Sequence, residues 1–175
     1  MDRGPFLSLP NAISMSRLVL AVAFVVVNDA RARIGLIGAA SFTDFLDGWV
    51  ARRQQSASYW GALIDPLADR AFVLTAVCGY LVSGAVTTVQ YFILISRDLM
   101  TAIGFIVARS VPMLRPIPFR ARPLGKTVTV LQLITLVVVL AAPHIVPELV
   151  WLVGVASVLA IADYTLALWN QRVRT

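Results

Sequence analysis

Six apolar segments dominate the sequence, and each is about as long as the hydrocarbon core of a membrane is thick. They cover residues 11–27, 33–53, 59–82, 87–109, 123–142 and 147–169. A helix needs about 20 such residues to span that core, and lipid offers the backbone no hydrogen-bond partners of its own. The sequence therefore predicts an all-α, integral membrane bundle of six transmembrane helices. Residues 1–175 are interpreted as one domain, with residues 1–9, too short to span, as an interfacial segment.

The composition fits a chain that faces lipid. Hydrophobic residues make up 59 % of the sequence and charged residues 14 %, against about 25 % charged in a soluble domain. The net charge is +6, but the basic residues flank the apolar segments, so lipid and membrane topology explain them better than nucleic acid. Cys78 is the only cysteine. It excludes an intrachain disulfide and is expected to be a small buried side chain.

Lysine and arginine are distributed unevenly between the two ends of the segments. One side collects Arg3, Arg52, Arg53, Arg109, Arg115, Arg120, Arg122, Lys126, Arg172 and Arg174. The loops of the other side hold only Arg31 and Arg33. Because basic loops stay in the cytoplasm, both termini and the junction of the second and third segments are predicted to be cytoplasmic. The predicted location is the inner or plasma membrane of a bacterium.

Turn residues separate the segments. Ser83-Gly84 falls between the third and the fourth, and prolines stand between the fifth and the sixth. Pro10-Asn11 is typical of a helix start, with Asn11 as the N-cap.

Four aspartates lie within two of the apolar segments. Asp44 and Asp47 are three residues apart, and Asp65 and Asp69 are four apart. Each pair therefore lies on one helix face. An ionised carboxylate in a membrane costs at least a few kcal/mol, so intramembrane acids indicate a function. Two helices joined by a short loop are antiparallel neighbours, so the two pairs are expected to converge.

Carboxylates gathered in this way repel one another unless cations lie among them. Oxygen ligands select hard cations such as Mg²⁺ or Mn²⁺, and two such ions would bring the site near neutrality while leaving positions for phosphate oxygens. One alternative is that the acids pair with Arg52, Arg53 or Arg70. Another is a small cation transporter or channel, but that predicts acids spread along a path rather than gathered at one end.

The stretch Asp44-x2-Asp47-Gly48-x2-Ala51-Arg52-x8-Gly61-x3-Asp65-x3-Asp69 resembles, at every fixed position, the signature of the CDP-alcohol phosphotransferase family. The resemblance implies that a phosphatidyl group passes from CDP-diacylglycerol to an alcohol, with release of CMP. It also implies a homodimer. Two ions of Mg²⁺ or Mn²⁺ would be held by Asp44, Asp47, Asp65 and Asp69, with Asp69 as the general base. The residues predicted to bind the nucleotide are Asn11, Gly48, Arg52, Ser58 and Gly61.

Three patterns outside this signature resemble phosphatidylglycerophosphate synthases and the related cardiolipin synthases. They are Leu9-Pro10-Asn11-x2-Ser14-x2-Arg17, Arg97-Asp98 and Gly125-Lys126-x2-Thr129-x2-Gln132. Ser14 stands where those enzymes usually have threonine, and Asp98 where they have glutamate. The resemblance implies glycerol 3-phosphate as the acceptor. A cardiolipin synthase, or another phosphatidyltransferase with a different acceptor, is the alternative.

An anionic acceptor requires a basic pocket. Its predicted residues are Arg97, Lys126, Arg120 and Arg122, whose alternative role is that of a cytoplasmic anchor. Adjacent helical residues face apart, so Asp98 is expected to find a partner other than Arg97.

Overall fold

The computed structural model describes the backbone of residues 9–54, 61–110 and 123–172, and the side chains of residues 15–46, 70–104 and 123–166. This part of the chain holds helices and no strand, which confirms the all-α prediction. The helices are α1 (Leu9–Val26), α2 (Ala30–Gln54), α3 (Gly61–Val82), α4 (Thr88–Ser110), α5 (Pro123–Ala141) and α6 (Val146–Arg172), with a 3₁₀ turn, η2 (Pro143–Ile145). Their bounds lie within about one helical turn of the predicted segments. Since α1 begins at Leu9, Asn11 lies inside the helix, and its prediction as the N-cap is wrong.

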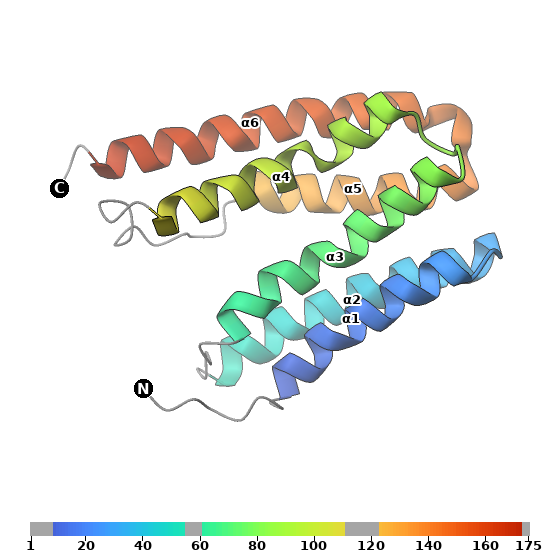
Figure 1. Cartoon of the computed structure of the whole chain (residues 1–175), viewed down its shortest axis with the longest axis horizontal. Helices are drawn as coiled ribbons and strands as arrows, with labels where there is room; N and C mark the ends of the chain where they lie inside the picture. The colour runs from blue at the N-terminus through green and yellow to red at the C-terminus, as the bar shows by residue number, and fades with distance from the viewer. Residues whose placement is uncertain (1–8, 55–60, 111–122, 173–175) are drawn as a thin grey trace. The chain divides into compact units, whose positions relative to one another are not determined.

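The chain divides into two compact units, one up to Ala85 and one from Val86 onward. In the first unit, α1 packs against both α2 and α3, and α2 runs antiparallel to the other two (Figure 1). In the second unit, α6 packs against both α4 and α5, and α5 runs antiparallel to its neighbours (Figure 1). One domain over the whole chain stays a prediction.

An aromatic cluster forms the core of the first unit. The ring of Phe24 in α1 meets the rings of Phe72 and Tyr80 edge-on, with centroids 5.8 and 5.5 Å away, and all three side chains are buried. Such edge-to-face pairs add to the hydrophobic contribution of burial. The guanidinium of Arg33 in α2 lies 5.2 Å from the Phe24 ring centre, and its Nε donates to the Val27 carbonyl at 2.6 Å. Arg33 thus caps the end of α1 and ties α2 to it.

The predicted break at Ser83-Gly84 is confirmed. Gly84 has a φ of 74°, in the left-handed region where a Cβ is unfavourable. The amide of Ala85 donates to the Tyr80 carbonyl at 2.9 Å, and that of Gly84 to Leu81 at 3.1 Å. These two bonds form the Schellman end that terminates a helix at a glycine.

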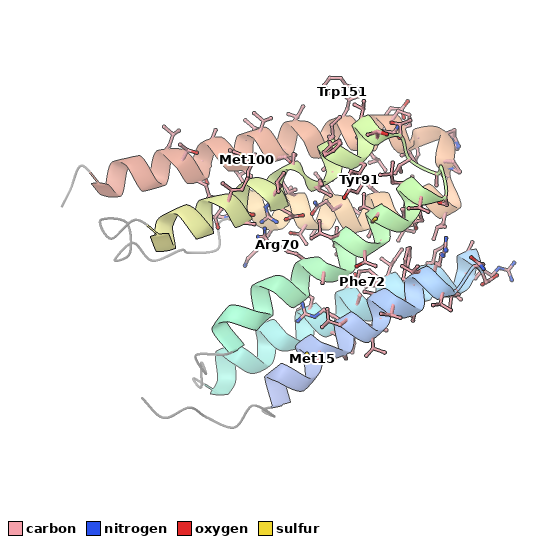
Figure 2. The ribbon with its side chains drawn as sticks, in the orientation of Figure 1. Met15, Arg70, Phe72, Tyr91, Met100 and Trp151 are labelled. Atoms are coloured by element: carbon pink, nitrogen blue, oxygen red, sulfur yellow. The ribbon has the colours of Figure 1, made fainter. Side chains whose placement is uncertain are left out.

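Apolar side chains also cover much of the outer surface. Val19 is 68 % exposed, Val158 is 66 % exposed, and Trp151, at 71 %, projects outward from α6 (Figure 2). Cys78 is exposed as well, so its expected burial is wrong. Among the residues with described side chains, Pro123–Ala141 and Pro143–Leu166 are long and apolar enough to cross a membrane. Shorter apolar stretches run over Met15–Val26 and Arg70–Val82.

Candidate functional site

The four signature aspartates belong to two helices of the first unit. Asp44 and Asp47 lie in the C-terminal half of α2, and Asp65 and Asp69 in the N-terminal half of α3. Because the two helices are antiparallel, these halves lie at the same end of the unit (Figure 1). Of the four side chains the structure describes only that of Asp44, so the convergence of the carboxylates stays a prediction.

The other predicted site residues are distributed over both units. Gly48 and Arg52 lie in α2, Gly61 begins α3, and Asn11 lies in the first turn of α1. The structure describes only the backbone at these four positions. Ser58, Arg120 and Arg122 fall outside the described residues altogether. Arg97 lies in the middle of α4, and Lys126 lies exposed in the first turn of α5.

Asp44 has a partner that the sequence did not suggest. Nη1 of Arg17, in α1, donates to Oδ1 of Asp44 at 3.1 Å. The Arg17 side chain is only 2 % exposed, whereas that of Asp44 is 53 % exposed. The partners considered from the sequence were arginines near the aspartates, but this one lies 27 positions earlier. Its only signal was its place in the first-helix pattern.

Asp44 has the exposure and chemistry that a metal ligand requires. Its half-exposed carboxylate is a hard oxygen donor of the kind that Mg²⁺ and Mn²⁺ prefer. Its described ion pair uses Oδ1 alone. No three acidic, histidine or cysteine side chains gather within the side chains that the structure describes. A metal centre at Asp44 would therefore need the signature aspartates beyond that set.

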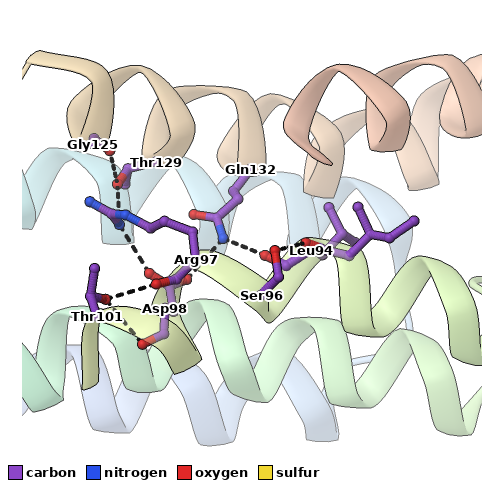
Figure 3. A network of polar contacts seen from close by, with 9 residues as sticks. Leu94, Ser96, Arg97, Asp98, Thr101, Gly125, Thr129 and Gln132 are labelled. Carbon is purple, nitrogen blue, oxygen red and sulfur yellow. Dashed lines mark hydrogen bonds and ion pairs between the residues drawn. The ribbon is translucent and has the colours of Figure 1, made fainter. Parts of the chain in front are cut away.

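A second polar cluster is buried between α4 and α5 (Figure 3). Nη1 of Arg97 donates to Oδ1 of Asp98 at 3.0 Å and to the Thr129 hydroxyl at 3.3 Å. The side chains of Arg97 and Asp98 are only 11 % and 5 % exposed. The expectation that Asp98 finds a partner other than Arg97 is confirmed by Gln132, which donates to its Oδ2, but Arg97 is a partner as well. The long arginine side chain reaches its neighbour, and two charges buried together must pair to offset their loss of water.

The pattern on α5 is the other half of this cluster. Nε2 of Gln132 donates to Oδ2 of Asp98 at 2.8 Å and to the Leu94 carbonyl at 2.6 Å. Thr129 and Gln132 lie four and seven residues after Gly125, which places all three on one helix face. A Cβ on Gly125 would lie 2.6 Å from Nη2 of Arg97, so a side chain there would displace the guanidinium.

The unequal burial of Arg17 and Asp44 predicts unequal costs of breaking their pair. In metal-free protein, Asp44→Asn should destabilise the fold by up to about 3 kcal/mol, because a buried cation loses one carboxylate partner. Arg17→Met should cost about 1 kcal/mol or less, because the carboxylate left behind is half in water. Thermal unfolding in detergent measures both. Asp29→Asn is the matched control, since Oδ2 of Asp29 accepts the Ala32 amide at 2.8 Å and asparagine caps equally well. A larger loss from Arg17→Met than from Asp44→Asn contradicts the account.

Comparison with known proteins agrees with the sequence resemblance. The family model for CDP-alcohol phosphatidyltransferase matches residues 7–169. The CDP-diacylglycerol–glycerol-3-phosphate 3-phosphatidyltransferase of Aquifex aeolicus is 30 % identical over 110 residues, which cover 59 % of this chain and 62 % of the relative. The human cardiolipin synthase (CMP-forming) is 29 % identical over 153 residues, 78 % of this chain and 51 % of the relative. A putative cardiolipin synthase of Mycobacterium tuberculosis is 35 % identical over 106 residues, 58 % of this chain and 51 % of the relative.

The chain thus aligns with between about half and 62 % of the length of these relatives. The family and the names of the relatives are those of transferases, as the signature predicted. The match over residues 7–169 includes every fixed position of that signature and shows that this chain belongs to the CDP-alcohol phosphatidyltransferase family.

Proposed function

We propose that this protein is a membrane enzyme that transfers a phosphatidyl group from CDP-diacylglycerol to glycerol 3-phosphate and releases CMP. The complete signature, inside a region matched by the family, carries the proposal. The placement of its four aspartates at one end of α2 and α3 supports it. The Aquifex relative named for this reaction supports the choice of acceptor.

The proposal includes six membrane crossings. The shortest helix, α1, has 18 residues, which corresponds to about 27 Å at 1.5 Å per residue, close to the ~30 Å of a bilayer core. Outward-facing apolar side chains such as Val19, Val158 and Trp151 suit lipid rather than water. The uneven distribution of lysine and arginine favours an orientation with the aspartates and both termini on the cytoplasmic side. The proposed location is the inner or plasma membrane of a bacterium. A homodimer is proposed by analogy with the family.

The donor half of the site would consist of the aspartates and the small residues beside them. Asp44, Asp47 and Asp65 would hold one ion of Mg²⁺ or Mn²⁺, and Asp44, Asp65 and Asp69 a second. When bound, such ions neutralise the diphosphate and stabilise the leaving CMP. Asp69 would take the proton of the acceptor hydroxyl. The residues proposed to hold the nucleotide are Asn11, Gly48, Arg52, Ser58 and Gly61.

The acceptor half would lie at the start of α5. Lys126 is exposed there, four residues after Arg122 and six after Arg120. Arg97 reaches the backbone of the same turn at Gly125. Charged donors of this kind, brought together at this helix turn, would suit the phosphate of glycerol 3-phosphate. The relatives named cardiolipin synthase favour a second candidate acceptor, phosphatidylglycerol.

A CMP-release assay with purified protein tests the proposal. CDP-diacylglycerol and Mg²⁺ or Mn²⁺ are supplied with glycerol 3-phosphate, phosphatidylglycerol or other alcohols. Release that depends on glycerol 3-phosphate is the expected result. Release with phosphatidylglycerol alone would favour the second candidate acceptor. No release of CMP with any acceptor would contradict the proposed enzyme activity and favour the alternative of a cation transporter or channel.

Asp65→Asn should abolish metal-dependent CMP release, because the proposed ions share this carboxylate. The loss should be about 10³-fold or more, of the order seen when a reaction loses one strong electrostatic contribution. Thermal unfolding should show an intact fold. Asp29→Asn, at the opposite end of α2, is the control and should keep full activity. Retained activity in Asp65→Asn would remove this residue from the metal site.

Lys126→Gln should raise the KM for glycerol 3-phosphate about tenfold or more, because a charge-assisted bond to phosphate is lost. The KM for CDP-diacylglycerol should stay unchanged. Arg31→Gln, which removes an exposed cation at the start of α2, is the matched control. Equal KM values for glycerol 3-phosphate in Lys126→Gln and wild type would assign Lys126 to membrane anchoring instead.

A further inference from the structure

We infer that Asp98, Gln132 and Gly125 are positioning residues that fix the guanidinium of Arg97 for an anionic acceptor. The inference rests on the proposed function, in which Arg97 binds the acceptor phosphate. The three residues would act through Arg97 and would not touch the acceptor. Their arrangement around the guanidinium is what carries the inference (Figure 3).

Asp98 binds one nitrogen of Arg97 and is itself fixed by Gln132. Its Oδ1 accepts from Nη1 of Arg97 at 3.0 Å, and its Oδ2 accepts from Nε2 of Gln132 at 2.8 Å. Gln132 is fixed in turn by its bond to the Leu94 carbonyl at 2.6 Å. Because both oxygens of Asp98 are engaged, its carboxylate cannot rotate without losing a bond, and Nη1 has a defined position.

Gly125 fixes the guanidinium from another side. A Cβ at this position would lie 2.6 Å from Nη2 of Arg97, closer than real side chains approach. In contrast, no described atom lies within 4 Å of a Cβ built on Gly104 or Gly79. The space that this glycine leaves is filled by the guanidinium of Arg97.

A merely structural link between α4 and α5 would not need a cation here. A buried ion pair contributes little net stability compared with well-packed apolar side chains. Nε of Arg97 is also buried with no hydrogen-bond partner among the described residues, so part of the guanidinium is unsatisfied within that set. A planar guanidinium held through Nη1 keeps its remaining donors for an oxygen anion, which it binds in a fixed geometry.

The test measures the interaction with glycerol 3-phosphate in two ways. One is the KM for glycerol 3-phosphate in the CMP-release assay, and the other is its Kd by calorimetry, which needs no turnover. Gly125→Ala and Gln132→Leu should each raise this KM and this Kd about tenfold, as expected when a bidentate charged contact is misaligned. The KM for CDP-diacylglycerol should not change. Asp98→Glu should restore most of the affinity that Asp98→Ala loses. Gly104→Ala and Thr127→Val are the controls. No described atom lies within 4 Å of a Cβ on Gly104, and the exposed Thr127 hydroxyl donates to the Pro123 carbonyl of its own helix.

The outcomes separate this inference from the function on which it rests. Lowered thermal stability in Gly125→Ala and Gln132→Leu with unchanged glycerol 3-phosphate affinity would overturn the inference and make the cluster a structural link. Unchanged affinity in Arg97→Gln would overturn it as well, because Arg97 would then not bind the acceptor. Wild-type protein that binds glycerol 3-phosphate through these residues but releases no CMP would contradict the proposed function and leave the positioning role supported.

Discussion

Charges inside apolar helices require partners, because a lone ion loses its water without compensation. Two ion pairs between described side chains meet that requirement. In the first unit Arg17 reaches across from α1 to Asp44 in α2, and in the second Arg97 pairs with its neighbour Asp98. Each pair includes a residue from a pattern shared with phosphatidyltransferases. These polar residues also link neighbouring helices, Arg17 to Asp44 of α2 and Asp98 to Gln132 of α5.

The two pairs differ in exposure, and this difference suits different tasks. The carboxylate of Asp44 is half exposed and anchored by a buried arginine, so its exposed side suits a cation. The carboxylate of Asp98 is buried and bonded through both oxygens, so it can orient an arginine but cannot bind a ligand. These two environments suit the proposed donor site, which would need metal, and the proposed acceptor site, which would need an arginine in a fixed position. They lie in separate units of the chain.

The number, order and bounds of the helices followed from the sequence, because apolar length and the turn at Ser83-Gly84 are local properties. Which polar groups meet did not follow. Helices that are apolar on several faces give no periodic signal for their rotation, so the contact of Arg17 with Asp44 could not be derived from spacing. The pairing of Arg97 with Asp98 went against the rule that adjacent residues face apart, since a long flexible side chain can bend back. In the sequence, Gly125 stood out only as part of a family pattern. The structure gives the physical reason for a glycine there, because a Cβ would collide with the guanidinium of Arg97.

The central claim is that the carboxylates of α2 and α3 form one metal centre that binds the CDP-linked donor. Anomalous diffraction from crystals grown with Mn²⁺ and CDP-diacylglycerol tests it most directly. The account predicts two manganese peaks among Asp44, Asp47, Asp65 and Asp69, each at metal–oxygen bonding distance of about 2 Å, with the diphosphate of the donor against them. Peaks elsewhere in the protein, or a bound donor with no metal between it and these aspartates, would contradict it.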